Sequence, residues 1–358
     1  MSTAELSPTL LSPLSLANPL RVLRGLASQD MAMDLGTANT LIYMKGTGIV
    51  LNQPSVVAID EATGKDVAVG HAAKEMFGKT SRSIRCFRPM KDGVIADFDM
   101  TTVMIRSMIR EVTRRFCLCR PRIVIGVPSG ITQVEKKAVV DAALCSGMRN
   151  VSLVEEPMAA ALGADLPVDK AVGNMIVDIG GGTTEVAILS MNETLYSHSI
   201  RVAGDVMDEV IQRHIQRVYN LQIGPTEAER IKLLIGSALP FGKARTISVC
   251  GRDMVSGRPV KVEVSDSKVR EALNEPISAI ISSVTTALEQ TSPEIARDIV
   301  SRGIYLAGGG SLLKGLGERL HRETGIPFHL ANDPLSSVVR GVGKIIDNYK
   351  NMKVLCIA

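Results

Sequence analysis

The sequence predicts an α/β protein made of two related halves, and three observations support this fold class. Apolar runs typical of strands alternate with amphipathic segments typical of helices along most of the 358 residues, which predicts parallel-rich sheets covered by helices. Residues 175–189, MIVDIGGGTTEVAIL, are typical of a strand, a tight glycine turn and a second strand. Residues 33–43, MDLGTANTLIY, repeat that pattern in the first half, which indicates an internal duplication.

Length and composition favour a globular protein with two domains, because 358 residues, 45% hydrophobic and 22% charged, can form two sizeable cores. A net charge of +4, 3% aromatic residues and no tryptophan give no sign of a nucleic-acid partner, and we expect none. Six cysteines without a C-x-x-C pair argue against a zinc site and predict reduced thiols in a cytoplasm. The sequence has neither a membrane-spanning apolar run of roughly 20 residues nor the basic start of a secretory signal.

The N-terminal region, residues 1–29, is expected to form a tail. Its first part is rich in serine, proline and leucine and predicts a poorly ordered segment. An Asn-Pro pair at 18–19 can then start a short helix in which Leu20, Leu23 and Leu26 share one face. This apolar face can pack on the protein's own domain or lie on an anionic membrane surface, and the residues alone leave both alternatives open.

After the first hairpin the sequence predicts two further strands around Pro54, followed by a turn-rich stretch that we interpret as a small insertion. Apolar residues recur at helical spacing over 98–115, which predicts a long amphipathic helix with methionines in the core. The helix leads into apolar residues 116–119, which include Phe116 and Leu118 and lie between pairs of arginines. These residues can fold into the core or press into lipid headgroups, and composition alone favours the buried loop.

Two neighbouring acids follow the later strands of the first half. Residues 123–127 predict a buried strand, and Thr132 with Glu135 forms the capping box of the next helix. A strand at 151–154 then delivers the sequence Glu-Glu-Pro, at 155–157, to the start of an alanine-rich helix. The acids can simply complement the helix dipole. They can equally place a carboxylate at the carboxyl end of a strand, where open α/β sheets hold their reactive groups.

The second half predicts a similar alternation of elements. Helices are expected at 204–220, 226–235, 267–290, 311–323 and 334–349, and strands at 246–264, 303–307 and 327–330. A third glycine turn, Gly308-Gly309-Gly310, stands between the strand at 303–307 and the helix that follows. A strand, a glycine turn and a helix N-terminus can form a platform for the polar edge of a nucleotide.

The glycine turns and their aspartates suit a bound polyphosphate. Three consecutive glycines at 180–182 allow the backbone to take left-handed conformations and to come close to a ligand, so that several N–H groups can point at one anion. Asp34 and Asp178 end the first strand of each hairpin, and across a cleft they would hold Mg²⁺ through water. The chain has no G-x-x-x-x-G-K-[ST] motif and no G-x-G-x-x-G after a first strand, which argues against P-loop and Rossmann sites.

Seven motifs resemble those of one superfamily, that of actin, sugar kinases and heat-shock chaperone ATPases. They are DLGTANTLIY from Asp34, RPMKDGVIADF from Arg88, VIGVPSGIT from Val124, EEPMAAA from Glu155, DIGGGTTEVA from Asp178, AERIK with IGSA from Ala228, and LAGGGSLL from Leu306. Within the superfamily the chain most resembles the MreB family of bacterial actin homologues. The motifs run in order over residues 30–350, so the resemblance covers all but the N-terminal tail.

The resemblance implies an actin-like ATPase fold with an ATP-binding cleft between two duplicated domains. Domain I would comprise residues 30–170 and 339–358, with a small subdomain at about 58–97. Domain II would comprise residues 171–338, with a small subdomain at about 207–270.

The resemblance also implies roles for individual residues. Glu156 would position the attacking water with help from Thr183, and Asp34 and Asp178 would hold Mg²⁺ through water. ATP would be held by the two hairpin turns, by an acid and a lysine near the ribose and adenine, and by the third glycine turn: Gly36, Thr37, Ala38, Asn39, Gly180, Gly181, Gly182, Thr183, Glu229, Lys232, Gly308, Gly309 and Gly310.

Filaments and a membrane are the expected partners in this family. ATP-bound subunits would stack head to tail into paired, antiparallel, straight filaments at the inner face of the cytoplasmic membrane, together with membrane-bound cell-wall elongation proteins that maintain rod shape. Leu20, Leu23 and Leu26 fall where some members have a membrane-binding helix. Phe116 and Leu118 fall where related proteins carry a membrane-inserting loop, which reverses the preference for a buried loop.

Two other functions occur in the same superfamily. A small-molecule kinase would use an acid to activate a substrate hydroxyl, but the sequence shows no obvious sugar-binding Asp/Asn cluster. A chaperone-like ATPase would need a separate peptide-binding domain, and we expect none after residue 350. The sequence therefore favours a cytoskeletal ATPase, with the kinase as the alternative.

Overall fold

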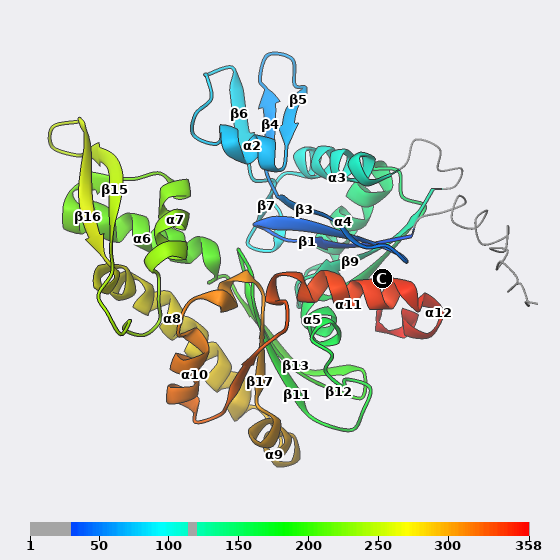
Figure 1. Cartoon of the computed structure of the whole chain (residues 1–358). Coiled ribbons are helices and arrows are strands. Elements are labelled where there is room, and N and C mark those ends of the chain that lie inside the picture. Colours follow the sequence, from blue (N-terminus) through cyan, green and yellow to red (C-terminus); the bar gives the residue numbers. More distant parts are fainter. Residues whose placement is uncertain (1–29, 114–119, 358) are drawn as a thin grey trace, which may run out of the picture.

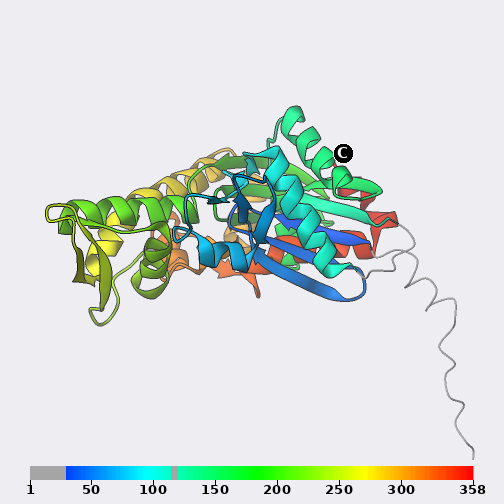
Figure 2. The same ribbon diagram turned by 90° about the horizontal axis from the view of Figure 1, so that it is seen from above.

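The computed structural model describes residues 30–113 and 120–357. The residues expected at a membrane, Leu20, Leu23, Leu26, Phe116 and Leu118, lie outside these ranges. Figure 1 shows a molecule of two halves, the first mainly blue to cyan at the upper right and the second mainly green to orange below it and to the left. Seen from above in Figure 2, the parts of both halves spread along one plane.

A five-stranded sheet forms the centre of the first half. Its order is β10-β9-β1-β2-β3, with β1–β2 and β2–β3 antiparallel and the other two pairs parallel. The strands are β1 (Met31–Leu35), β2 (Asn39–Met44), β3 (Gly48–Pro54), β9 (Arg122–Val127) and β10 (Asn150–Glu155).

The second half repeats this sheet. Its order is β13-β12-β11-β17-β18, again with three antiparallel strands followed by two parallel ones. The strands are β11 (Asn174–Ile179), β12 (Thr184–Ser190), β13 (Glu193–Ile200), β17 (Ile304–Ala307) and β18 (Phe328–Leu330). The expectation of parallel-rich sheets was wrong, because short turns join the first three strands of each half and force them antiparallel. The matching strand orders support the duplication that the two hairpins indicate.

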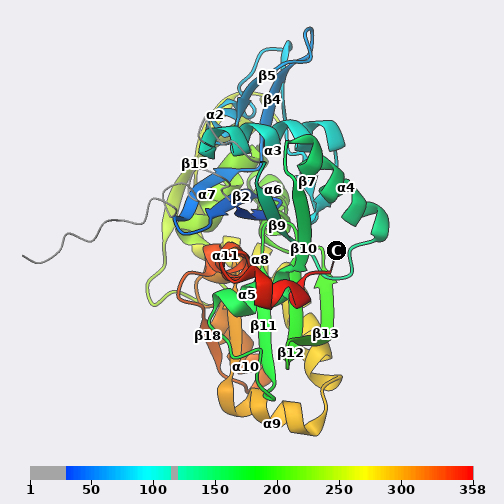
Figure 3. The same ribbon diagram turned by 90° about the vertical axis from the view of Figure 1, so that its right-hand side faces the viewer.

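Two helices pack between the sheets and the others cover the outer faces. The central pair is α5 (Glu156–Gly163) and α11 (Ser337–Asp347), which Figure 3 shows between the upper and lower strands. The first sheet packs against α3 (Phe98–Val112) and α4 (Gln133–Cys145) on its other face. The core on the outer face of the second sheet includes residues of α8 (Asp266–Glu289), α9 (Pro293–Arg302) and α10 (Leu316–Thr324). Three layers of helices therefore enclose two sheets.

Strand alternation decides which side chains reach the central layer. In β1 the side chains of Met31 and Met33 join the outer core beside α3, whereas Ala32 joins the central core with α5 and α11. Successive side chains of a strand point to opposite faces, so Asp34 lies on the same face as Ala32. On β11, Asp178 comes two residues after Ile176, which also belongs to the central core, so both side chains point to the same face. Both aspartates are therefore directed toward the space between the halves.

Each half also carries a small sheet in addition to its five-stranded sheet. The first is β5-β4-β6, of β4 (Val57–Asp60), β5 (Asp66–Val69) and β6 (Ile84–Phe87), next to α2 (His71–Met76). The second is β14-β15-β16, of β14 (Leu221–Gln222), β15 (Thr246–Asp253) and β16 (Pro259–Ser265), next to α6 (Gly204–Tyr219) and α7 (Pro225–Ile235). A hairpin of β7 (Met90–Lys91) and β8 (Val94–Ile95) and a short C-terminal helix, α12 (Tyr349–Met352), complete these elements.

Local sequence signals were reliable where they involve neighbouring residues. The capping box of α4 is present, since Thr132 Oγ1 accepts from Glu135 N and the Glu135 carboxylate accepts from Thr132 N. The methionines of α3 lie in the core as expected, with Met104 and Met108 fully buried. The helix expected at 311–323 starts later, at Leu316, after a 3₁₀ turn and a left-handed Gly315.

Three elements of the second half were missed, namely the strands β13 and β14 and the helix α9. Within the described residues, no helix has the length and apolar character needed to cross a membrane.

Candidate functional site: a nucleotide cleft between the halves

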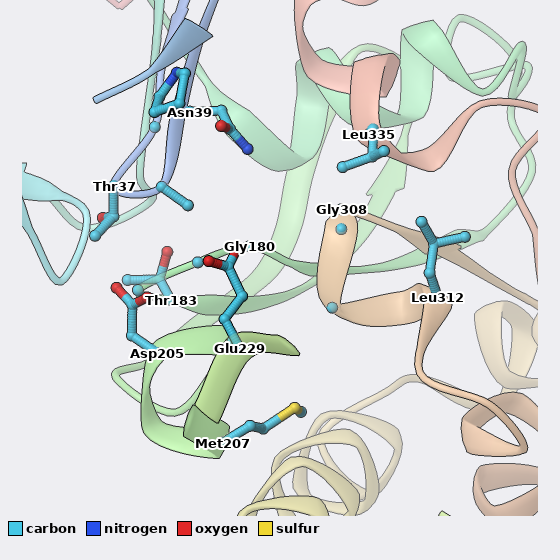
Figure 4. A pocket seen from close by; sticks show the side chains of 18 of the residues that line it. Thr37, Asn39, Gly180, Thr183, Asp205, Met207, Glu229, Gly308, Leu312 and Leu335 are labelled. Carbon is cyan, nitrogen blue, oxygen red and sulfur yellow. The ribbon is translucent and has the colours of Figure 1, made fainter. Parts of the chain in front are cut away.

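A cavity of about 330 Å³ lies between the two halves, which is large enough for a small-molecule ligand. All residues assigned to ATP and Mg²⁺ from the sequence line it. Figure 4 shows side chains from both halves converging on this space, with Thr37 and Asn39 on one side and Glu229 rising from α7 on the other. The predicted site residues are therefore brought together in one place.

The two hairpin turns approach each other across the cavity. A Cβ atom on Gly181 would lie 2.6 Å from Ala38 Cβ, and one on Gly182 would lie 2.6 Å from Thr37 Oγ1. The left-handed conformations that glycine permits are not used here, because the residues at 180–182 all have negative φ. At Gly181 and Gly182, glycine is required by the close approach of the opposite turn rather than by the backbone conformation.

The third glycine turn lines the cavity on the side of the second half. Gly308 has a φ of 76°, and a Cβ there would lie 2.3 Å from Asp178 Oδ1, so this turn packs directly on the end of β11. Leu312 and Leu335 line the cavity near Gly308 and are each 47% exposed (Figure 4). These two leucines form apolar walls suited to a flat ring. They were missed because nothing near them in sequence separates them from ordinary core leucines.

Four carboxylates gather where the cavity meets the central layer. Burial, followed by the charge of Asp178, raises the pKa of Asp34 to about 7. Burial likewise raises the pKa of Asp178 to about 7. The pKa of Glu156 is raised well above its usual value by burial and then by the charges of Glu185, Asp34 and Asp178. Such a cluster is unfavourable unless a cation or protons neutralise it.

Glu185 is the fourth carboxylate and was not predicted. It lies on β12, is only 1% exposed, and stands opposite Asp178 in the β11–β12 ladder. Burial raises its pKa to about 8, although the backbone N–H of Ser129 opposes this effect. The available signal was a lone acid inside the strand sequence TEVAILS, whose other members suit a buried strand.

Ion pairs connect the two halves at the mouth of the cleft. Lys74 on α2 pairs with Glu229 on α7 at 2.9 Å, and Arg88 pairs with Asp205 at the start of α6, also at 2.9 Å. Glu229 was expected to contact the ribose or adenine of the nucleotide. In the structure it contacts the small subdomain of the other half.

The lysine expected beside Glu229, Lys232, is held within its own half. Its Nζ donates to Gly204 O at 2.8 Å and to Asp208 Oδ2 at 2.9 Å. The amide of Gly204 donates in turn to Gly180 O, at 3.2 Å. Lys232 thus links α7 to the start of α6, and through it to the second hairpin turn.

Comparison with known proteins identifies the family. The model of the MreB/Mbl protein family matches residues 28–354 of this sequence. The chain belongs to the MreB/Mbl family. It is 51% identical over 333 residues to the cell shape-determining protein MreB of Escherichia coli (strain K12), covering 92% of this chain and 96% of that protein.

Solved structures agree with the fold of the MreB/Mbl family. The crystal structure of MreB5 of Spiroplasma citri bound to AMPPNP is 35% identical, with a TM-score of 0.86, and covers 91% of this chain and 98% of that one. The MamK double helical filament, at 24% identity and a TM-score of 0.75, covers 89% of this chain and 98% of that one. The latter likeness concerns the fold alone. This MreB/Mbl chain therefore has an actin-like fold.

The site of this MreB/Mbl chain fits a divalent cation held mainly through water and phosphate. Asp34 and Asp178 supply hard oxygen atoms from opposite halves, and burial raises the pKa of both carboxyl groups. Within the described ranges, no group of three His, Cys, Asp or Glu side chains is arranged to hold a metal directly. Magnesium usually keeps several waters and takes only one or two carboxylates, so this donor set suits it.

The carboxylate cluster predicts a pH-dependent stability of the nucleotide-free protein. Folding raises the pKa of Asp34 and Asp178 from 3.8 to about 7 and that of Glu185 from 4.5 to about 8. The folded protein then binds more protons than the unfolded chain, so its free energy of unfolding should fall by several kcal/mol, as an order of magnitude, between pH 5 and 8. Urea unfolding in EDTA measures this change. Asp178→Asn should flatten the slope, and a wild-type stability that is equal or higher at pH 8 would contradict the prediction.

The ion pair at the mouth predicts a modest effect on nucleotide release. The side chains of Lys74 and Glu229 are about one third exposed, so their pairing contributes under about 1 kcal/mol. Lys74→Ala should therefore speed the release of a fluorescent ATP analogue by about two- to fivefold, measured by stopped flow. Lys268→Ala, which breaks a comparable pair with Glu271 on α8, is the matched control. Equal release rates for both variants would show that the cleft pair does not retain nucleotide.

Proposed function

We propose that this chain binds ATP, hydrolyses it slowly and assembles into cytoskeletal filaments that help to determine cell shape. The observation that carries the proposal is the pair of Asp-x-Gly hairpins, one from each half, that face each other across a cleft beside Glu156. The 51% identity to a cell shape-determining protein supports the cellular role. The AMPPNP bound to MreB5 of Spiroplasma citri supports ATP as the nucleotide.

The residues around the cleft suit phosphoryl transfer to water. This reaction needs charge neutralisation and an oriented water more than a strong base. Bound Mg²⁺, held by Asp34 and Asp178 through water, would supply the neutralisation. Glu156 begins α5 and reaches over β9, where its Cγ lies 3.6 Å from the place of a Cβ on Gly126. From there Glu156 would orient the attacking water, and Thr183 of the opposite turn would assist.

Filament formation would take place at a membrane. We propose paired, antiparallel, straight filaments, the assembly that the family resemblance implies. Within each filament, a head-to-tail contact that does not close would generate the polymer. They would lie in the cytoplasm at the inner face of the membrane, with anionic lipids and membrane-bound cell-wall elongation proteins as partners. The lipid contacts would come from residues outside the described ranges: Leu20, Leu23, Leu26, Phe116 and Leu118. The boundaries of domains I and II, with their small subdomains, likewise remain a proposal.

A small-molecule kinase on the same fold is not favoured. The sequence belongs to the MreB/Mbl family along nearly its whole length, and its relative in Escherichia coli is a cell shape-determining protein. A kinase would consume ATP in proportion to a sugar or similar substrate rather than to its own concentration. Turnover that rises steeply with such a substrate would reopen this alternative.

The decisive experiment images the purified protein on an anionic lipid monolayer with Mg·ATP by negative-stain electron microscopy. Paired straight filaments on the lipid are the expected result. Omitting ATP and replacing the anionic lipid with a neutral one are the controls for nucleotide and membrane dependence. Dispersed particles over a wide range of protein concentrations would contradict the cytoskeletal function.

A further inference from the structure

A second set of contacts joins the two halves behind the cleft, away from the ion pairs at its mouth. Glu185 of the second half accepts a hydrogen bond from the backbone N–H of Ser129, with Ser129 N at 3.2 Å from Oε1 and 3.1 Å from Oε2. Ser129 belongs to the turn that follows β9 of the first half. One carboxylate therefore bridges the halves with both of its oxygens.

A neighbouring contact joins the same parts. Thr194 Oγ1, on β13 of the second half, donates to Glu155 Oε2 at 3.2 Å. Glu155 ends β10 and directly precedes Glu156, the first residue of α5. The second contact holds the segment that carries Glu156 directly. The first holds Ser129, two residues after Val127, which pairs with Glu155 in the β9–β10 ladder. We call Glu185–Ser129 and Thr194–Glu155 the rear brace.

The position of Glu185 on its sheet fixes the direction of its side chain. In the ladders Glu185 stands between Asp178 on β11 and Ser199 on β13. Ala187, two residues later on the same strand, lies in the central core between the sheets. Glu185 therefore points into the central layer beside Glu156, whose pKa its charge helps to raise.

Hydrolysis requires groups from both halves to be placed correctly relative to each other. Glu156 belongs to the first half, whereas the turn of Gly180 to Thr183 belongs to the second. A displacement of about 1 Å between a catalytic group and its substrate can cost roughly 100-fold in rate. Nucleotide binding is less demanding, because it is spread over the turns and the apolar walls that line the cavity.

We propose that Glu185 is a positioning residue for ATP hydrolysis: through its bond to the Ser129 amide, the rear brace sets Glu156 against the phosphate-binding turn of the second half. This inference rests on the proposed ATPase function. It separates two kinds of contact between the halves. The pairs at the mouth act on nucleotide release, and the rear brace acts on the chemical step.

The test compares single-turnover phosphate release and ATP affinity in the full-length chain and three variants. Glu185→Ala should slow phosphate release by about 10- to 100-fold with ATP affinity within about threefold. Glu185→Gln keeps an oxygen that accepts from Ser129, and should restore release to within about threefold of wild type. Thr194→Val, which removes one donor without changing shape, should slow release by about two- to tenfold.

A control and a second readout keep the inference separate from the proposed function. Thr285→Val, on the α8 surface, removes a hydroxyl bonded only within its helix and should change nothing. Amide hydrogen exchange should speed up at Ser129 in Glu185→Ala and remain slow in Glu185→Gln. This readout does not require hydrolysis.

Three outcomes would overturn the inference. They are wild-type phosphate release in Glu185→Ala, equal loss in Glu185→Gln and Glu185→Ala, and unchanged exchange at Ser129. The first would leave ATP hydrolysis standing. ATP binding without phosphate release in the wild-type protein would instead contradict the proposed function.

Discussion

Replacing Glu156 with alanine is expected to lower ATP turnover by about 100-fold or more while ATP affinity changes by less than about threefold. Glu156 is the carboxylate that begins α5 and lines the cavity with Asp34 and Asp178. Orientation of the attacking water would depend on it, whereas the phosphates would be held by backbone groups of the two turns. Steady-state phosphate release and equilibrium binding of a fluorescent ATP analogue measure the two effects separately.

The same variant should fold without difficulty. Glu156 is one of four acids that repel each other in the nucleotide-free protein, so its removal relieves a buried charge. Urea unfolding at pH 8 should therefore show equal or greater stability for Glu156→Ala than for wild type. Glu289→Ala, an exposed acid at the end of α8, is the matched control. Wild-type turnover in Glu156→Ala would remove Glu156 from the proposed mechanism.

Replacing Gly341 with alanine should destabilise the protein by about 2–4 kcal/mol. Gly341 lies in α11 where that helix crosses α5, and a Cβ there would fall 1.8 Å from the backbone oxygen of Ala159. Alanine is the better helix former by about 1 kcal/mol, so any loss must come from this contact. Backbone cannot rotate away as a flexible side chain can, and the two helices would have to separate.

The consequence should extend to the cleft, because α5 and α11 form the layer between the two sheets (Figure 3). Forcing these helices apart would move one half relative to the other, and with it Glu156 relative to the phosphate-binding turns. Chemical denaturation measures the loss of stability, and Gly242→Ala is the control because a Cβ there meets nothing within 4 Å. Equal stability of the two variants would show that the helix crossing adjusts without cost.

Sequence signals located many of the residues that line the cavity, because these residues lie in short continuous segments. Asp34 and Asp178 each end a strand immediately before a glycine turn, so residues adjacent in sequence set both the turn and the carboxylate. The α4 capping box succeeded for the same reason, since its two partners are three residues apart. The start of α10 was misjudged because a glycine run permits both a turn and a helix.

Contacts between distant segments were not predictable in this way. Glu185 appears in sequence as one polar residue in an apolar strand, and only the docking of Ser129 from the other half gives it a partner. Lys74 and Glu229 are 155 positions apart and meet because α2 and α7 flank the same opening. Such pairs depend on how complete sheets and helices pack, which no local pattern of residues encodes.

The sequence by itself determined the duplicated hairpins, the phosphate-binding turns and the metal-binding aspartates proposed here, because turn geometry and strand alternation are local properties. Tertiary structure alone decided the apolar walls of Leu312 and Leu335 and the rear brace around Glu185. The physical reason is that burial and charge repulsion are set by the whole surroundings of a side chain. A carboxylate such as Glu185 gains a partner only when the fold packs the other half of the protein against it.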